Sequence, residues 1–141
     1  MLNLEIIILK NLKYEMLTTS SYQFLTIIAQ NLKDDSDKEL TLNLALYILD
    51  LTLLEYKMLK FPSSVKACAS IYIARKLLKY KDAWNHEIKN VFSFCDGVIR
   101  GCSTEITYLI NLANKSSFKN CKKKYSSSEF LNVSKILEDF K

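Results

Sequence analysis

The residues of this chain that could carry out chemistry are one histidine, a few cysteines and a run of lysines near the C-terminus. His86 is the only histidine, and no acidic and nucleophilic residues accompany it in a recognisable pattern. The four cysteines form no Cys-x-x-Cys pair, whereas a zinc site needs closely spaced thiolates and imidazoles. They are Cys68, Cys95, Cys102 and Cys121, of which Cys68 and Cys102 fall where core residues would lie. We therefore predict no metal site, and we interpret His86 as a polar residue in the first turn of a helix.

Cys95 and Cys121 are the two candidates for an activated thiol. A thiolate nucleophile needs a neighbouring base or strongly positive surroundings. Cys121 lies among lysines, so its pKa could fall; they are Lys119, Lys122, Lys123 and Lys124. A run of this kind is more often a solvated basic tail than a catalytic centre. The two glycines stand alone, so no phosphate-binding loop is present. We predict a protein that is not an enzyme and that binds no cofactor.

The same basic run, "FKNCKKKY", has a second interpretation as a nucleic-acid contact. Lysines beside Phe118 and Tyr125 could touch phosphates and bases. Arginine is scarce, however, because only Arg75 and Arg100 occur. The net charge of +5 permits an acidic partner without requiring one.

The composition of the whole chain predicts one all-α domain. The chain has 141 residues, 49% of them hydrophobic and 25% charged, which is typical of a globular protein with a real core. Two glycines and one proline are too few for most strand-rich folds. No uncharged run approaches the roughly 20 residues of a membrane span, and we do not expect the apolar N-terminus "MLNLEIIILK" to be a signal peptide, because it carries Glu5 and lacks a basic start. We therefore interpret the cysteines as reduced thiols inside a cell.

Hydrophobic spacing and capping patterns predict the first helices. A leading helix is expected over 3–13, within a leading segment that covers 1–14. Ser20 and Gln23 form a capping box at the start of a helix over about 20–32, and its predicted apolar stripe is Phe24, Ile27, Ile28 and Leu32. Ser36 and Glu39 form a second capping box, before a helix that runs to about Leu54 and is apolar nearly all round.

The stretch "KFPSSVKACASIYIARKLL" (60–78) predicts the central helix of a bundle. Pro62 suits a helix start, where its missing N–H costs nothing. Ala67, Ala69, Ser70 and Ala74 offer little side-chain volume. Small residues let neighbouring helices approach closely from several directions, so we expect this helix to be surrounded by others.

The second half of the chain predicts two more helices and a tail. The first covers about 84–94, with Asn85 as a plausible N-cap. Asp96-Gly97 is read as a turn, followed by a helix with Ile99, Cys102, Ile106, Leu109, Ile110 and Ala113 inward. The segment 115–141 is rich in Ser and Lys and is read as a mostly irregular tail. We expect it to pack back on the bundle through Tyr125, Phe130, Val133 and Ile136.

Four segments, in this order, resemble one family. "LKYEMLTTSSYQFL" (12–25) is similar to the family pattern Leu-x-Phe/Tyr-x-Leu-x-x-Pro-Thr-x-x-x-Phe-Leu, with Thr19 in place of proline. "SSVKACASIYIARKLL" (63–78) is similar to Pro-Ser-x-x-Ala-x-Ala-Ala/Ser-x-x-Leu-Ala, with Ser63 in place of proline. "AWNHEI" followed by "FCDGVIRGC" is similar to Trp-x-x-x-Leu, then Tyr, then a Cys in the last helix; the positions that fit are Trp84, Ile88, Phe94 and Cys102. "KYSSSEFLNVS" (124–134) is similar to Lys-Tyr-x-x-Ser-x-x-x-x-Val-Ser. Residues 1–141 therefore resemble the second, C-terminal cyclin box of mitotic A- and B-type cyclins.

The resemblance implies a five-helix cyclin-box bundle and a non-catalytic regulatory subunit of a cyclin-dependent protein kinase that controls the cell cycle. In that family the kinase is bound mainly through a first cyclin box, which is absent from this chain. No kinase-contact residue is therefore transferred, and the partner interface stays unassigned. The family also implies a nuclear and cytoplasmic location, without a membrane.

Two alternatives remain open. Transcription factors of the TFIIB class use tandem cyclin-like folds and bind DNA, a role that the lysine run could serve. The domain could also be a scaffold whose first and last helices bind other proteins. A large contiguous apolar surface patch would support the scaffold hypothesis.

Overall fold

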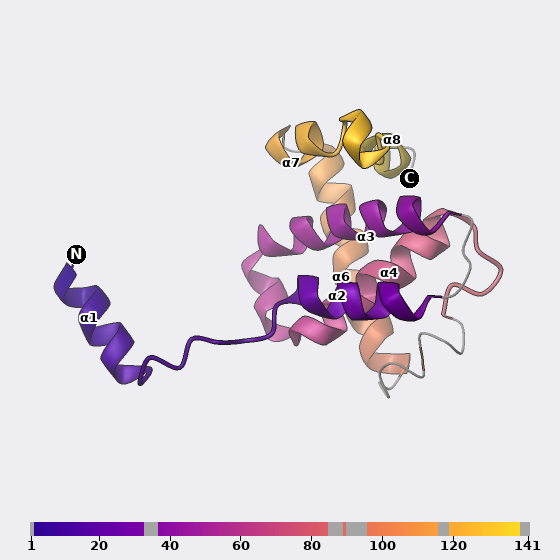
Figure 1. Ribbon diagram of the computed structural model, residues 1–141. Coiled ribbons are helices and arrows are strands. Elements are labelled where there is room, and N and C mark those ends of the chain that lie inside the picture. The colour runs from indigo at the N-terminus through magenta and orange to yellow at the C-terminus, as the bar shows by residue number, and fades with distance from the viewer. Residues whose placement is uncertain (1, 33–36, 85–88, 90–95, 116–118, 139–141) are drawn as a thin grey trace.

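The computed structural model describes residues 2–32, 37–84, 89, 96–115 and 119–138, and within these ranges every regular element is helical. The elements are α1 (Leu2–Asn11), α2 (Ser21–Asn31), α3 (Lys38–Leu53), α4 (Ser63–Leu77), α6 (Asp96–Lys115), α7 (Lys119–Lys124) and α8 (Ser134–Glu138), with 3₁₀-helices η1 (Tyr56–Lys60) and η2 (Ser128–Phe130). Figure 1 shows α2, α3, α4 and α6 as one bundle, with α7 and α8 at one end of α6. The predicted all-α fold is confirmed.

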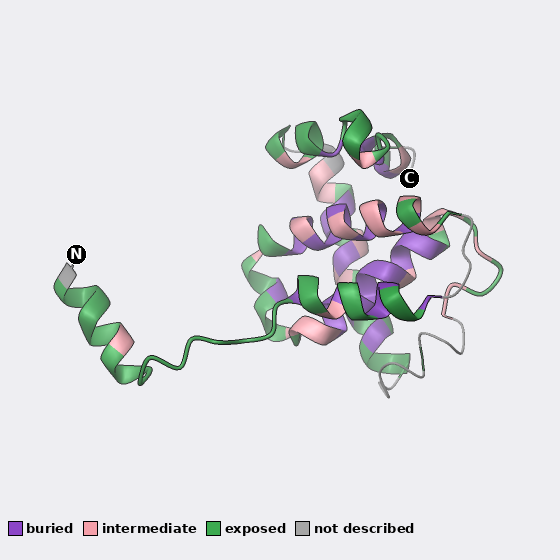
Figure 2. Ribbon diagram, in the orientation of Figure 1, coloured by how far each residue is buried: buried purple, intermediate pink, exposed green. Residues whose placement is uncertain are grey.

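Helix α4 lies at the centre of this bundle, and α2, α3 and α6 pack around it. Its small residues are all fully buried, each with 0% exposure: Ala67, Ala69, Ser70 and Ala74. Small side chains allow axes to approach toward the short end of roughly 8–10 Å. Figure 2 shows α4 buried along most of its length. The prediction of a central small-residue helix is confirmed, with Pro62 as the residue just before its first turn.

Helix α2 begins as the sequence predicts. Ser20 Oγ accepts a hydrogen bond from the backbone N–H of Gln23 at 3.3 Å, and Gln23 Oε1 accepts one from the N–H of Ser20 at 2.8 Å. The buried face of α2 differs by about one position from the predicted apolar stripe. Ile27, predicted inward, is 41% exposed, whereas Leu25 is 2% exposed. The inward positions predicted correctly are Phe24, Ile28 and Leu32.

Helix α3 is the second heavily buried helix, as predicted. Its buried apolar residues are Leu44, Ala45, Tyr47, Ile48, Leu49 and Leu51. The helix begins at Lys38 after Asp37, whose side chain makes no capping bond. The predicted capping box with Ser36 at the cap is therefore one residue too early, and Ser36 itself lies outside the described residues. Aspartate is itself a preferred cap residue, so sequence alone does not separate the two positions.

Helix α6 corrects one prediction. Asp96 and Gly97 form its first turn, not a separate turn before it. Aspartate is favoured there by the helix dipole, and glycine is tolerated near the start of a helix. The inward residues are those predicted: Ile99, Cys102, Ile106, Leu109 and Ile110 are buried and Ala113 is half-buried. The helix expected over 84–94, with Asn85 at its cap, lies almost wholly outside the described residues.

The C-terminal segment is more regular than predicted. It contains α7, η2 and α8, and it packs on the bundle through Tyr125, Val133 and Leu137, each at most 1% exposed. Phe130 and Ile136 are partly buried. The prediction of a mostly irregular tail was wrong because helices of five or six residues are too short to show a hydrophobic period and depend on tertiary packing. The predicted inward residues are confirmed.

Helix α1 stands away from the bundle in Figure 1 and is joined to it by an extended segment over residues 15–20. Its apolar side chains are exposed, among them Leu4 at 64%, Ile7 at 54% and Ile8 at 50%. The predicted leading helix is present, but the bundle does not bury it. Within the described ranges, no helix has the length and apolar character needed to cross a membrane.

Candidate functional site

The residues that the sequence singled out for chemistry are not brought together. His86 and Cys95 lie outside the described residues. Cys68 on α4 and Cys102 on α6 are both fully buried in the core, as predicted. Among the described residues, no group of three or more His, Cys, Asp or Glu side chains could hold a metal ion.

The two core thiols predict how stability depends on pH. Burial raises the pKa of Cys68, and likewise that of Cys102, from 9.0 to about 12. Between these values the unfolded chain binds fewer protons than the folded one, so the free energy of unfolding should fall as the pH rises above about 9. Urea unfolding in reducing buffer, repeated from neutral to alkaline pH, would measure this fall. Cys68→Ala should reduce the slope; an unchanged slope in Cys68→Ala would show that the pKa of this thiol is the same in the folded and unfolded states.

Cys121 is not an activated thiol in this structure. It is partly buried on α7, and burial raises its pKa, with the nearby Asp50 carboxylate adding to the effect. Lys124 acts in the opposite direction but does not outweigh them. The pKa of Cys121 is thus shifted upward, opposite to the direction in which the neighbouring lysines alone would move it. Neighbouring lysines in the sequence spread around a helix, whereas Asp50 approaches from another helix, which the sequence did not reveal.

Half of the lysine run is engaged with carboxylates of the same chain. Lys122 Nζ lies 2.7 Å from Glu138 Oε1, and Lys124 Nζ lies 2.8 Å from Asp50 Oδ2. Tyr125, which the nucleic-acid hypothesis needs at the surface, is 1% exposed. Phe118 lies outside the described residues. These contacts weaken the hypothesis that the run is a DNA-binding surface.

Asp50 instead ties the C-terminal segment to α3. Its Oδ2 accepts a hydrogen bond from the Tyr125 hydroxyl at 2.7 Å as well as the contact from Lys124. The Tyr125 ring stacks on Tyr47 with centroids 4.7 Å apart and contacts Phe130 at 4.9 Å. This cluster explains why the tail packs closely on the bundle. The sequence predicts that Tyr125 faces inward, and this is confirmed, but it does not reveal Asp50 as the partner.

A second polar feature begins where α4 ends. Lys79 has a left-handed backbone (φ 59), and the N–H of Tyr80 donates to the carbonyl of Arg75 at 3.0 Å. The N–H of Lys79 donates to the carbonyl of Lys76 at 3.1 Å, which completes a Schellman motif. The motif turns the chain back along α4, and the Tyr80 ring packs on the Arg75 guanidinium at 4.5 Å.

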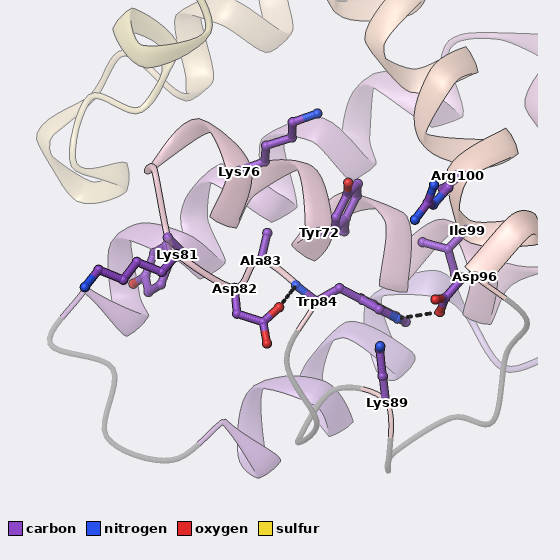
Figure 3. A pocket seen from close by; sticks show the side chains of 11 residues that line it. Tyr72, Lys76, Lys81, Asp82, Ala83, Trp84, Lys89, Asp96, Ile99 and Arg100 are labelled. Carbon is purple, nitrogen blue, oxygen red and sulfur yellow. Dashed lines mark hydrogen bonds between the residues drawn. The ribbon is translucent and has the colours of Figure 1, made fainter.

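Trp84 forms a wall of the hollow that this turn creates (Figure 3). Its backbone N–H donates to Asp82 Oδ1 at 3.3 Å, and its indole Nε1 donates to Asp96 Oδ1 at 3.2 Å. The indole meets the ring of Tyr72 edge-on, with centroids 6.2 Å apart. The hollow measures about 420 Å³, and Lys76 and Arg100 are among the residues that line it.

A second hollow of about 480 Å³ lies between α4 and α6 and shares Tyr72, Lys76 and Arg100 with the first. We call the two together the α4–α6 groove; the residues that matter below are Tyr72, Lys76, Trp84, Arg100, Thr104 and Thr107. The sequence alone does not reveal this groove, because its two helices are separated in the chain by residues 78–95.

Comparisons with known proteins identify the fold. The sequence matches the family "Cyclin, C-terminal domain" over residues 19–139. It is 31% identical over 130 residues to the G2/mitotic-specific cyclin-B of Dictyostelium discoideum, covering 92% of this chain and 29% of that relative. It is 28% identical to cyclin-B2-1 of Arabidopsis thaliana, covering 95% and 30%, and 28% identical to the G2/mitotic-specific cyclin-B of Hydra vulgaris, covering 91% and 37%.

These matches span nearly the whole bundle, including the central helix α4 and the tail with Tyr125. The chain spans about a third of the length of the curated relatives that it matches. The similarity to mitotic cyclins seen in four sequence motifs is confirmed. The chain therefore belongs to the cyclin family and carries its C-terminal domain.

Proposed function

We propose that this chain is the C-terminal part of a mitotic cyclin, a non-catalytic regulatory subunit of a cyclin-dependent protein kinase. The observation that carries the proposal is the match to the cyclin C-terminal domain over residues 19–139, together with relatives named G2/mitotic-specific cyclin-B. A regulatory subunit acts by binding one kinase conformation better than another, and it needs a stable surface rather than reactive groups. Such a protein would act in the nucleus and the cytoplasm.

The packing of the bundle supports a role as a rigid binding partner. Helix α4 is enclosed by α2, α3 and α6, and its thiol on Cys68 is buried and neutral at physiological pH. Cys102 is similarly inert. The domain can therefore present its outer helices without internal rearrangement.

Helix α1 supports a further part of the proposal, namely that most kinase contacts are made through a first cyclin box. Its exposed apolar side chains, including Leu4 and Ile7, are not covered by the bundle. Exposed apolar surface of this kind is typical of a contact with another domain or protein. We therefore place α1 at the junction with the first box, and we expect residues 1–141 alone to bind the kinase weakly or not at all.

A chimaera would test the proposal. Residues 19–139 would replace the C-terminal domain of the Dictyostelium G2/mitotic-specific cyclin-B, and phosphorylation of a peptide by its kinase partner would be measured. We expect the chimaera to restore most of the activity that is lost when that domain is deleted. In a parallel titration, residues 1–141 alone should show little affinity for the kinase.

The two measurements can fail separately. A chimaera that is folded but no more active than the deletion would refute a regulatory role for this domain. Tight kinase binding by residues 1–141 alone would leave the regulatory role intact but would overturn the assignment of the contacts to the first box. The unmodified Dictyostelium cyclin-B is the positive control.

A further inference from the structure

Among the described residues that line the α4–α6 groove, the cationic side chains outnumber the carboxylates. Lys76 and Arg100 are exposed at its rim. Among the described residues, the ion pairs are Lys60–Glu105, Lys122–Glu138 and Lys124–Asp50, and none of them involves either residue. Two carboxylates, those of Asp82 and Asp96, also line the first hollow, where each accepts a hydrogen bond from Trp84 and offsets part of the positive charge.

The floor of the groove adds hydrogen-bond acceptors. The Thr104 hydroxyl donates to the carbonyl of Arg100 at 3.0 Å, and the Thr107 hydroxyl donates to the carbonyl of Ser103 at 2.9 Å. Each hydroxyl has thus used its only proton within α6, but its lone pairs can still accept. Both face the hollow between α4 and α6. They suit N–H groups of a ligand, as the backbone of a peptide provides.

The groove also contains aromatic surface, in addition to its cations and hydrogen-bond acceptors. Tyr72 lines both hollows, and its ring meets Trp84 edge-on. Arg100 on α6 and Lys76, one turn after Tyr72 on α4, line the same two hollows, and Figure 3 labels all three side chains. The groove therefore combines cations for acidic groups, acceptors for N–H groups and an aromatic face for apolar side chains.

We propose that the α4–α6 groove is a docking site for an acidic peptide segment of a partner protein. Charge complementarity selects an anionic ligand, and the acceptor hydroxyls select one that also has N–H donors. A nucleic acid fits less well, because its backbone offers no N–H donors and its affinity depends on neutralising many phosphates in a row. The site is separate from any kinase contact through a first cyclin box, so this proposal does not rest on the proposed function.

Fluorescence anisotropy with this chain would test the proposal directly. The probe is a fluorescein-labelled short peptide that alternates Glu and Val, and the comparison peptide has Gln in place of Glu. The variant K76E/R100E should weaken binding of the Glu peptide by at least about tenfold, because it removes two charge-assisted contacts and reverses both charges. The matched control is K119E/K123E, which changes the net charge equally on exposed lysines of α7 and should bind as the unmodified chain does.

A second variant distinguishes peptide binding in the groove from a general effect of the net charge on binding. T107V keeps the charge and nearly the shape but removes an acceptor, and it should weaken binding by about threefold. Equal losses in K76E/R100E and K119E/K123E would overturn the proposal, as would an absence of binding at low salt or equal binding of the Gln peptide. A short DNA duplex that binds more tightly than the Glu peptide, with the same dependence on Lys76 and Arg100, would overturn the choice of a peptide. Melting curves of each variant verify that it is folded.

Discussion

Replacing Tyr125 by alanine should lower the free energy of unfolding by about 3–5 kcal/mol, the usual cost of removing a large buried aromatic side chain. Tyr125 is 1% exposed, stacks on Tyr47 and contacts Phe130. Its removal would leave a cavity between α3 and the C-terminal segment. It would also remove the hydroxyl that donates to Asp50 at 2.7 Å. Urea unfolding followed by circular dichroism would measure the loss.

Tyr125→Phe is the matched control for this prediction. It keeps the stacking on Tyr47 and removes only the hydrogen bond to Asp50, so it should cost about 1–2 kcal/mol. Asp50 would keep its contact with Lys124. If the alanine variant lost no more stability than the phenylalanine variant, the tail would not be packed on α3 as described.

The second large effect is expected at the centre of the bundle. Ala69→Leu should lower the free energy of unfolding by about 1–3 kcal/mol, because it inserts three carbons where there is no space. Ala69 is 0% exposed, and its helix packs against α2, α3 and α6. The added side chain cannot relax toward solvent, and a shift of α4 would disturb all three neighbours. Thermal melting and urea unfolding would both report the change.

Ala113→Leu adds the same three carbons at a half-buried position on α6. Because this residue lies at the rim, the extra carbons can extend toward solvent, and a change within about 0.5 kcal/mol is expected. A loss for Ala69→Leu as small as that for Ala113→Leu would mean that α4 is not the enclosed helix of the bundle.

The sequence contained most of the information about the core. Capping residues located the start of α2, and small residues identified α4 as the enclosed helix, because both signals depend on local chemistry. Cys68 and Cys102 were also placed correctly in the core. The assignment of Ile27 to the buried stripe failed because adjacent helical positions differ by only about 100°, and packing decides which of them faces inward.

The candidate sites depended on contacts that sequence order does not show. The pKa of Cys121 follows from its burial and from Asp50 on another helix, although the residues beside it in the chain are lysines. The α4–α6 groove requires Lys76 and Arg100 to lie on facing helices. The interpretation of Asp96-Gly97 as a turn was wrong for a different reason. The same two residues are common in turns and are also tolerated at the start of a helix.

The extended segment over residues 15–20 has a consequence for how the chain can be divided. The capping box begins at Ser20, and both of its hydrogen bonds form between Ser20 and Gln23. Every buried side chain that the structure describes lies after this point. A polypeptide that starts at Ser20 would thus keep the first helix cap and all of these buried side chains, and it should fold as an autonomous unit. The orientation of α1 would then be set by contacts with another domain or protein.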